Sequence, residues 1–396
     1  MESYDNVIDT LKTQRENILG NRWKEAEKGV LKTVENWIKN LGLPEEVFTR
    51  YLEFIDDENI LYYSKAYRDH FFHVFHNFLL GFQILYEFRD EEDTPFGKDY
   101  WNENRFLKKW LLTCLWHDLT YILEKGGSKG LKEFIDRKLQ FDIEIKEYWS
   151  RILTKKENIN AIDILSERFD SKDPIRKLKF REWLQYQIVE KHDHGIVSAI
   201  LLLKDGEKWT LNKDIIKDSD LALYQDIIEE SSLAIALHNY HKSNKFDGEL
   251  IIEEYPLAFL LSYCDTAQEW GRPSAFNVPN LFEYYKTKVN MAEKCIKIYL
   301  KVNLNKIDIE NEKLSGKTQR RYNDAKLRVD NRLKNDLSAL RPIFEKMINE
   351  VSTFSNKKTE DQLWQIINFY NERDKIENAW KSDHWVFNVI VRPYIE

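Results

Sequence analysis

The sequence FLKKWLLTCLWHDLTYIL, residues 106–123, is an apolar stretch interrupted by one histidine-aspartate doublet, His117-Asp118. Leu, Trp and Ile recur at helical spacing, so we predict a buried helix over residues 105–123 that ends before the sequence KGGSKG. Adjacent imidazole and carboxylate groups suit Fe, Mn, Co, Ni or Zn. A single doublet of this kind is more often a structural pair. Its role therefore depends on the other histidines and carboxylates of the chain.

The rest of the chain also predicts a mainly α-helical protein. Its 396 residues include only 13 Gly and 8 Pro, which favours long helices over a β fold with many turns. Helical periodicity starts near residue 7 and stops at the sequence GLP, which begins at Gly42. Further helices are predicted at about 45–55, through HFFHVFHNF to about 88, and at 130–155, 160–169, 174–191, 195–204, 220–240 and 255–268.

The pattern changes after about residue 285. Apolar and polar residues alternate from Ile296 to Ile309, as in a half-buried strand. A charged helical segment and a short helix near EDQLWQIINFYNER follow, and the last residues, HWVFNVIVRPYIE, are rich in β-branched and aromatic side chains. The sequence thus predicts a small C-terminal α+β appendage on a helical body.

Composition and charge exclude several classes of protein. The net charge of −7 does not favour a nucleic-acid binder, which needs a basic surface. The basic segment at 317–341 contains interspersed aspartates, so a solvated helix face is the preferred interpretation. The three cysteines are widely spaced and predict neither a disulfide framework nor a cysteine zinc site. We find no apolar signal core and no membrane-spanning run, so we expect a cytoplasmic protein.

The histidines are concentrated in one part of the sequence. Eight of the nine lie between His70 and His241, in the clusters HFFHVFH, WHDL, KHDHG and LHNYH. A fifth element, LLSYCDTAQEWGRP, places Asp265 at the end of an apolar helix. A carboxylate in that position is costly unless it is paired, hydrogen-bonded or bound to a metal. These companions favour a metal site at the doublet.

The order H…HD…H…H…D resembles the HD superfamily of metal-dependent phosphohydrolases. The resemblance covers roughly residues 62–273 and is carried by YRDHFFHVFHNFLLG, LWHDLTYILEK, KHDHGIVSAILLL, IALHNYHK and PLAFLLSYCDTAQEWGRP. It implies an HD-domain helical bundle whose ligands converge on the bundle axis. We accordingly divide the chain into an N-terminal helical segment that packs on the bundle, an HD domain and the appendage, at residues 1–61, 62–285 and 286–396.

The resemblance also implies the metal ligands. His73 matches the first histidine, His117 and Asp118 the doublet, and Asp265 the closing aspartate; His194 and His238 match the additional histidines of members that bind two metals. His192 and His194 cannot both face inward if their segment is helical. His194 is preferred because it precedes the small residues of GIVSA, and His238 is preferred over His241. His76 is assigned to packing.

Candidate residues for binding the substrate are less specific. Arg272 would hold a phosphate, although a surface ion pair with Glu269 explains it equally well. His70 would contact a phosphate or pair with Asp69. His241 and Lys125 are weaker candidates for the substrate side of the site.

The resemblance implies a phosphohydrolase that cleaves a phosphoester or phosphodiester bond of a nucleotide or cyclic nucleotide by metal-activated water, with His117 and Asp118 at the catalytic centre. One or two divalent ions are expected: Mn, Fe, Co, Ni or Zn, with Mg as a further candidate. The expected partner is a small nucleotide, and nucleic acid is a less favoured partner. We expect no binding to membranes. The sequence leaves open whether the chain forms a homo-oligomer. Two alternatives remain, an HD-fold diiron oxygenase and a non-catalytic nucleotide sensor.

Overall fold

The protein is mainly helical in its computed structural model. The structure describes residues 23–61, 71–88, 94, 96, 105–121, 155–170, 172–191, 193–240, 250–267, 282–290, 293–303, 380–381 and 386–394. The chain divides into two compact units, Met1–Cys264 and Asp265–Glu396. Among the described residues, no helix combines the length and the apolar character needed to cross a membrane.

The first unit consists of helices that agree with most of the predicted segments. The predicted helix at 130–155 and the part of the first helix before residue 23 lie outside the described residues. The described helices of this unit, with α13 running into the second unit, are α2 (Trp23–Leu41), α3 (Glu45–Leu61), α4 (Phe71–Glu87), α5 (Arg105–Trp116), α9 (Lys156–Phe169), α10 (Pro174–Tyr186), α11 (His194–Leu211), α12 (Leu221–Leu237) and α13 (Pro256–Ala267).

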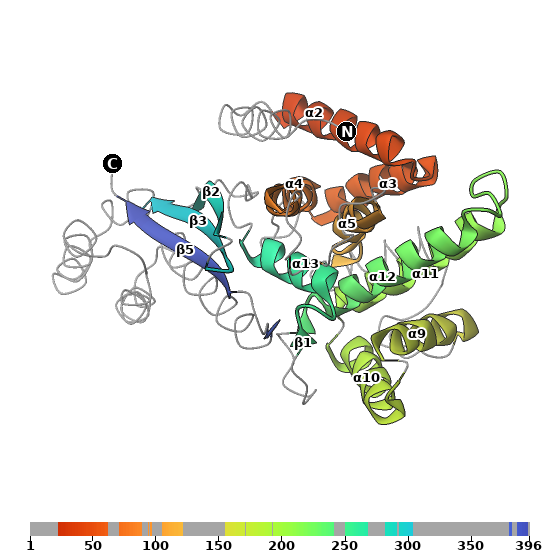
Figure 1. Cartoon of the computed structure of the whole chain (residues 1–396). Helices are drawn as coiled ribbons and strands as arrows, with labels where there is room; N and C mark the ends of the chain where they lie inside the picture. Colours follow the sequence, from red (N-terminus) through yellow and green to blue (C-terminus); the bar gives the residue numbers. More distant parts are fainter. Residues whose placement is uncertain are drawn as a thin grey trace, which may run out of the picture. The chain divides into compact units, whose positions relative to one another are not determined.

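Helix α5 lies in the middle of this unit, as Figure 1 shows. It packs against α4, α11 and α12, and α12 also packs against α9 and α11. Helix α2 contacts both α3 and α4. This packing brings α4 and the ends of α5, α11 and α12 close together, although the four helices are far apart in the sequence.

The predicted stop signal after α2 is confirmed. Gly42 has a φ of 64°, in the left-handed region that glycine adopts at low cost. The amide of Gly42 donates to the carbonyl of Lys39, and the amide of Leu43 donates to the carbonyl of Ile38, both at 3.0 Å. These two bonds form a Schellman motif, which satisfies the last carbonyls of the helix and ends it at Leu41.

Helix α4 approaches α5 closely because Gly81 has no side chain. A Cβ atom at this position would lie 2.1 Å from Cζ2 of Trp110, whose indole is fully buried. The indole nitrogen donates to the carbonyl of Phe78 at 2.9 Å, which holds the ring against α4. The contact places the first turns of α4 beside the end of α5.

The prediction of one helix over residues 105–123 is wrong at its C-terminal end. Helix α5 ends at Trp116, and residues 117–120 form turns. The amide of Thr120 donates to Oγ of Ser198 at 3.1 Å, so it is not available for a helical bond to Trp116, whose carbonyl accepts from Leu119 instead. A contact with α11 therefore ends the helix just before the His117-Asp118 doublet.

A group of charged side chains joins α5, α9 and α12. Lys109, which is only 6% exposed, pairs with Asp226 at 2.8 Å and also with Glu230. Arg105 and Arg168 pair with Asp226 too. Burial alone would raise the pKa of Asp226, but hydrogen bonds from Lys109 and Arg105 hold it well below the usual range. Asp226 is therefore ionised in the folded protein over the ordinary pH range.

We expect Asp226→Asn to lower the free energy of unfolding at pH 7 by about 1–3 kcal/mol, because it removes the anion that three cations share. A depressed pKa stabilises the fold above the unfolded value of about 3.9 and loses this effect as pH falls through the folded value. In urea titrations, the difference between the two proteins should thus stay constant from pH 7 down to about pH 5 and shrink as the pH falls below about 3.9.

The matched control is Asp163→Asn, which removes an exposed pair with Arg181 at 3.0 Å. It should cost less than about 1 kcal/mol at any pH. An equal loss of stability for Asp226→Asn at pH 7 and at about pH 2, well below the unfolded pKa of about 3.9, would contradict the assignment.

The second unit contains a three-stranded sheet in the order β2-β3-β5. Strands β3 (Cys295–Asn303) and β5 (Val386–Tyr394) confirm the two predicted strands, and they pair in parallel. In β3, Ile296 and Ile298 are fully buried, which agrees with the predicted alternation. The short strand β4 (Trp380–Lys381) also belongs to this unit.

Strand β2 (Phe282–Asn290) was not predicted from the sequence, and it pairs with β3 in antiparallel orientation. Its register shifts between Tyr284 and Lys286, which interrupts the period-two pattern on which the prediction relies. The predicted helices between residues 309 and 373 lie outside the described residues.

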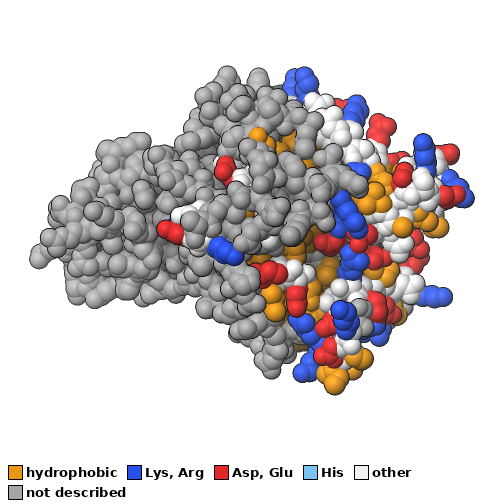
Figure 2. Space-filling model, viewed as in Figure 1, with side chains coloured by type: hydrophobic (Ala, Val, Ile, Leu, Met, Phe, Trp, Pro, Cys, Tyr) orange, Lys and Arg blue, Asp and Glu red, His pale blue; other side chains and the backbone are white. Residues whose placement is uncertain are grey.

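Basic and acidic side chains alternate over the described part of the surface in Figure 2. This face shows no broad area of one charge among its described residues. It therefore gives no support to a nucleic-acid surface, which requires clustered Lys and Arg.

Candidate metal centre

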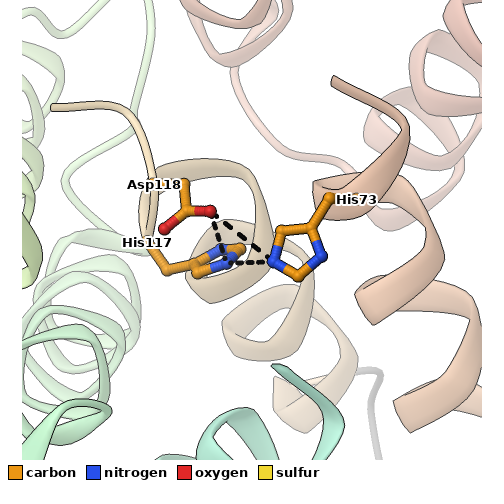
Figure 3. Close-up of side chains that lie close together, drawn as sticks. All are labelled: His73, His117 and Asp118. Carbon is orange, nitrogen blue, oxygen red and sulfur yellow. Dashed lines mark hydrogen bonds and ion pairs between the residues drawn. The ribbon is translucent and has the colours of Figure 1, made fainter. Parts of the chain in front are cut away.

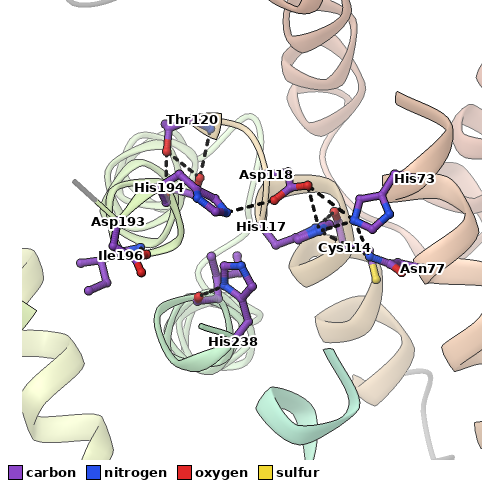
Figure 4. A network of polar contacts seen from close by, with 12 residues as sticks. His73, Asn77, Cys114, His117, Asp118, Thr120, Asp193, His194, Ile196 and His238 are labelled. Carbon is purple, nitrogen blue, oxygen red and sulfur yellow. Dashed lines mark hydrogen bonds and ion pairs between the residues drawn. The ribbon is translucent and has the colours of Figure 1, made fainter. Parts of the chain in front are cut away.

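Five of the predicted ligands come together in the interior of the first unit (Figure 4). All five are buried, with at most 5% of their surface exposed. Two groups of donor atoms can each hold a metal ion, and within each group the atoms lie within 4.8 Å of one another. The groups are His73, His117 and Asp118, and Asp118, His194 and His238.

The first group is a triangle of nearly equal sides (Figure 3). Nε2 of His73 lies 3.5 Å from Nε2 of His117, and each of these nitrogens lies 3.5 Å from Oδ2 of Asp118. The centre of such a triangle is about 2.0 Å from each corner, which is the length of a Zn–N or Zn–O bond. The three atoms therefore fit a divalent ion without rearrangement.

Asp118 belongs to both groups because its two oxygens point in different directions (Figure 4). Oδ2 completes the triangle with His73 and His117, whereas Oδ1 lies 3.2 Å from Nε2 of His194. The ring of His238 completes the second group, with its centroid 5.3 Å from that of His194. One carboxylate can thus serve both groups.

Two of the histidines have a defined tautomer. Nδ1 of His117 lies 2.8 Å from the carbonyl oxygen of Cys114, and Nδ1 of His238 lies 2.6 Å from that of Ile235. Because a carbonyl only accepts hydrogen bonds, each Nδ1 carries a proton, and in the neutral ring Nε2 then carries the lone pair that can bind a metal. Both histidines directly follow a helix and use a carbonyl of its last turn; the carbonyl of Ile235 also accepts from the amide of His238 at 3.4 Å.

His194 is the first residue of α11. The side chain of Asp193 caps this helix by accepting from the amide of Ile196 at 3.1 Å. The hydroxyl of Thr120 donates to the carbonyl of His194 at 2.6 Å, and it also lies 2.9 Å from Oγ of Ser198. The start of α11 is therefore bonded to the turn that carries the doublet.

Gly195 allows His238 to approach α11. A Cβ atom at this position would lie 2.3 Å from Cε1 and 2.6 Å from Nδ1 of His238, and 3.0 Å from the carbonyl oxygen of Ile235. This contact agrees with the preference for His194 that the small residues of GIVSA suggested. His192 and His241, the competing histidines, lie outside the described residues.

His76 belongs to neither group of donors. Its ring packs near those of Phe72 and Phe75. Burial, with a contribution from His73, lowers the pKa of His76 to about 3, so the ring is neutral at physiological pH. These contacts agree with its assignment to packing.

The remaining predicted residues are not brought into the two groups. Asp265 lies half-buried on α13 and is the first residue of the second unit. His70, Lys125, His241 and Arg272 lie outside the described residues. Their roles as ligand or substrate contacts stay predictions.

The structure adds three polar residues that the sequence did not single out. Asn77, Thr120 and Ser198 are all fully buried and lie beside the predicted ligands. Asn77 could have been found, because it follows His73 by four residues and thus shares its helix face. No sequence signal connects Thr120 with Ser198, since 78 residues separate them.

In comparisons with known proteins, no family model, no curated protein and no solved structure matches this chain. The buried histidines and aspartate are compatible with an HD-type metal site and could hold a metal ion. The geometry of these donors is thus the observation on which a functional assignment rests.

Proposed function

We propose that this protein is a divalent-metal-dependent phosphohydrolase of the HD type, which cleaves a phosphoester or phosphodiester bond of a nucleotide or cyclic nucleotide. The observation that supports it best is Asp118, a buried carboxylate whose two oxygens face two separate sets of histidine nitrogens. Such a carboxylate is costly to bury unless positive charge compensates it. Two divalent ions would supply that charge.

The residues present fit the two ions. His73, His117 and Asp118 would hold the first, and Asp118, His194 and His238 the second, with Asp265 as a further proposed ligand. Bound divalent ions lower the pKa of water toward neutrality and polarise phosphoryl oxygens. The donor set of imidazole and carboxylate suits Mn, Fe, Co, Ni or Zn, and Mg is a further candidate.

The protein itself contributes orientation. The carbonyls of Cys114 and Ile235 keep the Nδ1 protons of His117 and His238 in place, so both rings present Nε2 to the site. The buried surroundings strengthen every electrostatic interaction with the substrate phosphate. The proposed phosphate contacts are His70, Lys125, His241 and Arg272, and the nucleotide is proposed because the sequence motifs resemble those of HD phosphohydrolases.

The deciding experiment is metal analysis of protein purified without added metal, together with a panel of phosphate monoesters, diesters and nucleotides. We expect up to two ions per chain and metal-dependent phosphate release. Removal of the ions with a chelator should abolish activity and lower the thermal unfolding midpoint, because ions that bind only the folded state stabilise it. Added Mn should restore both.

Two outcomes would replace this proposal with another function. Iron-dependent consumption of oxygen without phosphate release would indicate a diiron oxygenase. Tight binding of a nucleotide without turnover at saturating metal would indicate a sensor.

A further inference from the structure

Asn77 lies on α4, one turn after His73, and its side chain points to the same group of donors (Figure 4). Its amide nitrogen lies 3.2 Å from Nε2 of His73 and 3.4 Å from Nε2 of His117. The residue is fully buried, and its Oδ1 has no hydrogen-bond partner within the described part of the chain. A buried amide oxygen without a hydrogen bond destabilises the folded protein.

The amide nitrogen of Asn77 also adds a fourth atom to the triangle of donor atoms in the first group. It forms a second triangle on the His73–His117 side of the first, and the five distances of the two triangles, 3.2–3.5 Å, equal those of five edges of a tetrahedron of donors. The centre of a regular tetrahedron of this size lies about 2.1 Å from each corner, which is the distance of a ligand from a divalent metal. The end of the Asn77 side chain thus occupies the place of a fourth ligand.

The orientation of the side-chain amide of Asn77 suits the state in which no metal ion is bound. The NH₂ group of Asn77 can donate to Nε2 of His117, because the proton of this ring lies on Nδ1. When an ion takes the lone pairs of His117 and His73, this NH₂ group loses its acceptors and faces a cation. A half-turn about the Cβ–Cγ bond exchanges nitrogen and oxygen at little cost, because this torsion is broad and nearly two-fold.

We propose that Asn77 is a fourth protein ligand of the ion held by His73, His117 and Asp118, and that it binds through Oδ1 after this half-turn. The inference rests on the proposed function, since it assumes that the first group binds a metal. Its consequence is an inequality between the two ions. With Asn77 added, the first group supplies four protein ligands and the second supplies three, so we expect the first ion to be held more tightly.

The test uses Co²⁺ as the probe, because its visible absorption reports the number and type of ligands. Chelator competition and the absorption spectrum are compared in the wild type, Asn77→Leu and Asn77→Asp. Loss of the oxygen in Asn77→Leu should weaken the tighter site by about 10- to 100-fold and change its spectrum. Asn77→Asp retains an oxygen ligand, so it should bind Co²⁺ at least as tightly as the wild type.

Asn158→Leu is the matched control, because it replaces another buried asparagine that lies on α9, outside both donor groups. It should leave the affinity and the spectrum unchanged. Thermal unfolding with a chelator present shows whether Asn77→Leu folds. We expect a midpoint equal to or above that of the wild type, since an unpaired polar group is removed.

Three results would overturn the inference. Wild-type affinity and spectrum in Asn77→Leu would show that the residue is not a ligand, while the proposed function would stand. Loss of Co²⁺ binding in Asn77→Asp would show that the site needs the NH₂ donor rather than an oxygen. Absence of Co²⁺ binding in the wild type would overturn the inference and the proposed function together.

Discussion

Replacement of Asp118 by alanine is expected to remove both ions and to lower phosphohydrolase activity by roughly a thousand-fold or more, since metal ions supply several kcal/mol of transition-state stabilisation. The large effect follows from the position of the carboxylate. Its Oδ2 completes the first group of donors, and its Oδ1 lies 3.2 Å from His194 in the second. Both groups therefore lose a ligand, and that ligand is the carboxylate which the two groups share.

Asp118→Asn tests the effect of the negative charge separately from the effect of the size of the side chain. It keeps one oxygen and the size of the side chain but removes the negative charge, so we expect at most one ion per chain and activity close to that of Asp118→Ala. The measurements are metal content per chain by elemental analysis and initial rates at saturating Mn. Full metal content and full activity in Asp118→Asn would exclude the bridging role.

A buried carboxylate outside the site provides the control. Asp205, which is 8% exposed, pairs with Arg50 at 3.0 Å. Asp205→Asn should lower stability because it removes the charge of one of the two carboxylates, Asp205 and Glu53, that pair with the partly buried guanidinium of Arg50. It should retain the ions and the activity, which separates loss of the site from loss of the fold.

Gly195→Ala is expected to remove the second ion while the first stays bound. The added Cβ would lie 2.3 Å from Cε1 of His238, closer than side chains pack in proteins, and the nearby carbonyl of Ile235 prevents the backbone from moving away. His238 must then leave its position and its hydrogen bond to Ile235. We expect one ion per chain and a loss of activity of about 100-fold or more, because two-metal sites clamp both reacting oxygens.

Helix α11 contains its own control for this variant. Gly206 also faces α12, where an added Cβ would lie 2.5 Å from Cγ2 of Ile228. Gly206→Ala should therefore lower the free energy of unfolding by about 1–3 kcal/mol through overpacking. It should leave both ions in place. Equal metal content in the two variants would show that Gly195 affects only packing.

Much of the candidate site was predictable because its ligands lie in short, distinctive sequences. The doublet in an apolar stretch and the clustering of eight histidines led to His73, His117, Asp118, His194 and His238, which the structure brings together. Helical geometry allowed only one of His192 and His194 to face inward, and the small residues of GIVSA favoured His194. The identity of candidate metal ligands can therefore be predicted from short local sequences.

The failures of prediction arose where contacts distant in the sequence determine the structure. Helix α5 ends at Trp116 because the amide of Thr120 bonds to Ser198 on α11. Strand β2 was missed because its shift in register interrupts the alternation that would have identified it. Asn77 follows His73 by four residues, but this spacing alone does not show that its amide also lies close to His117, 40 residues further along the chain.

The sequence by itself determined the helical body, the two long strands β3 and β5 and the set of residues that can bind a metal, because hydrophobic periodicity and the chemistry of histidine and aspartate are local properties. The tertiary structure alone decided the distances between these residues. Equal spacings of 3.5 Å in the first group, the division of the Asp118 oxygens between two groups, and the close approach of His238 to Gly195 all depend on how four helices pack. Packing of this kind is a property of the whole core, and no single segment contains it.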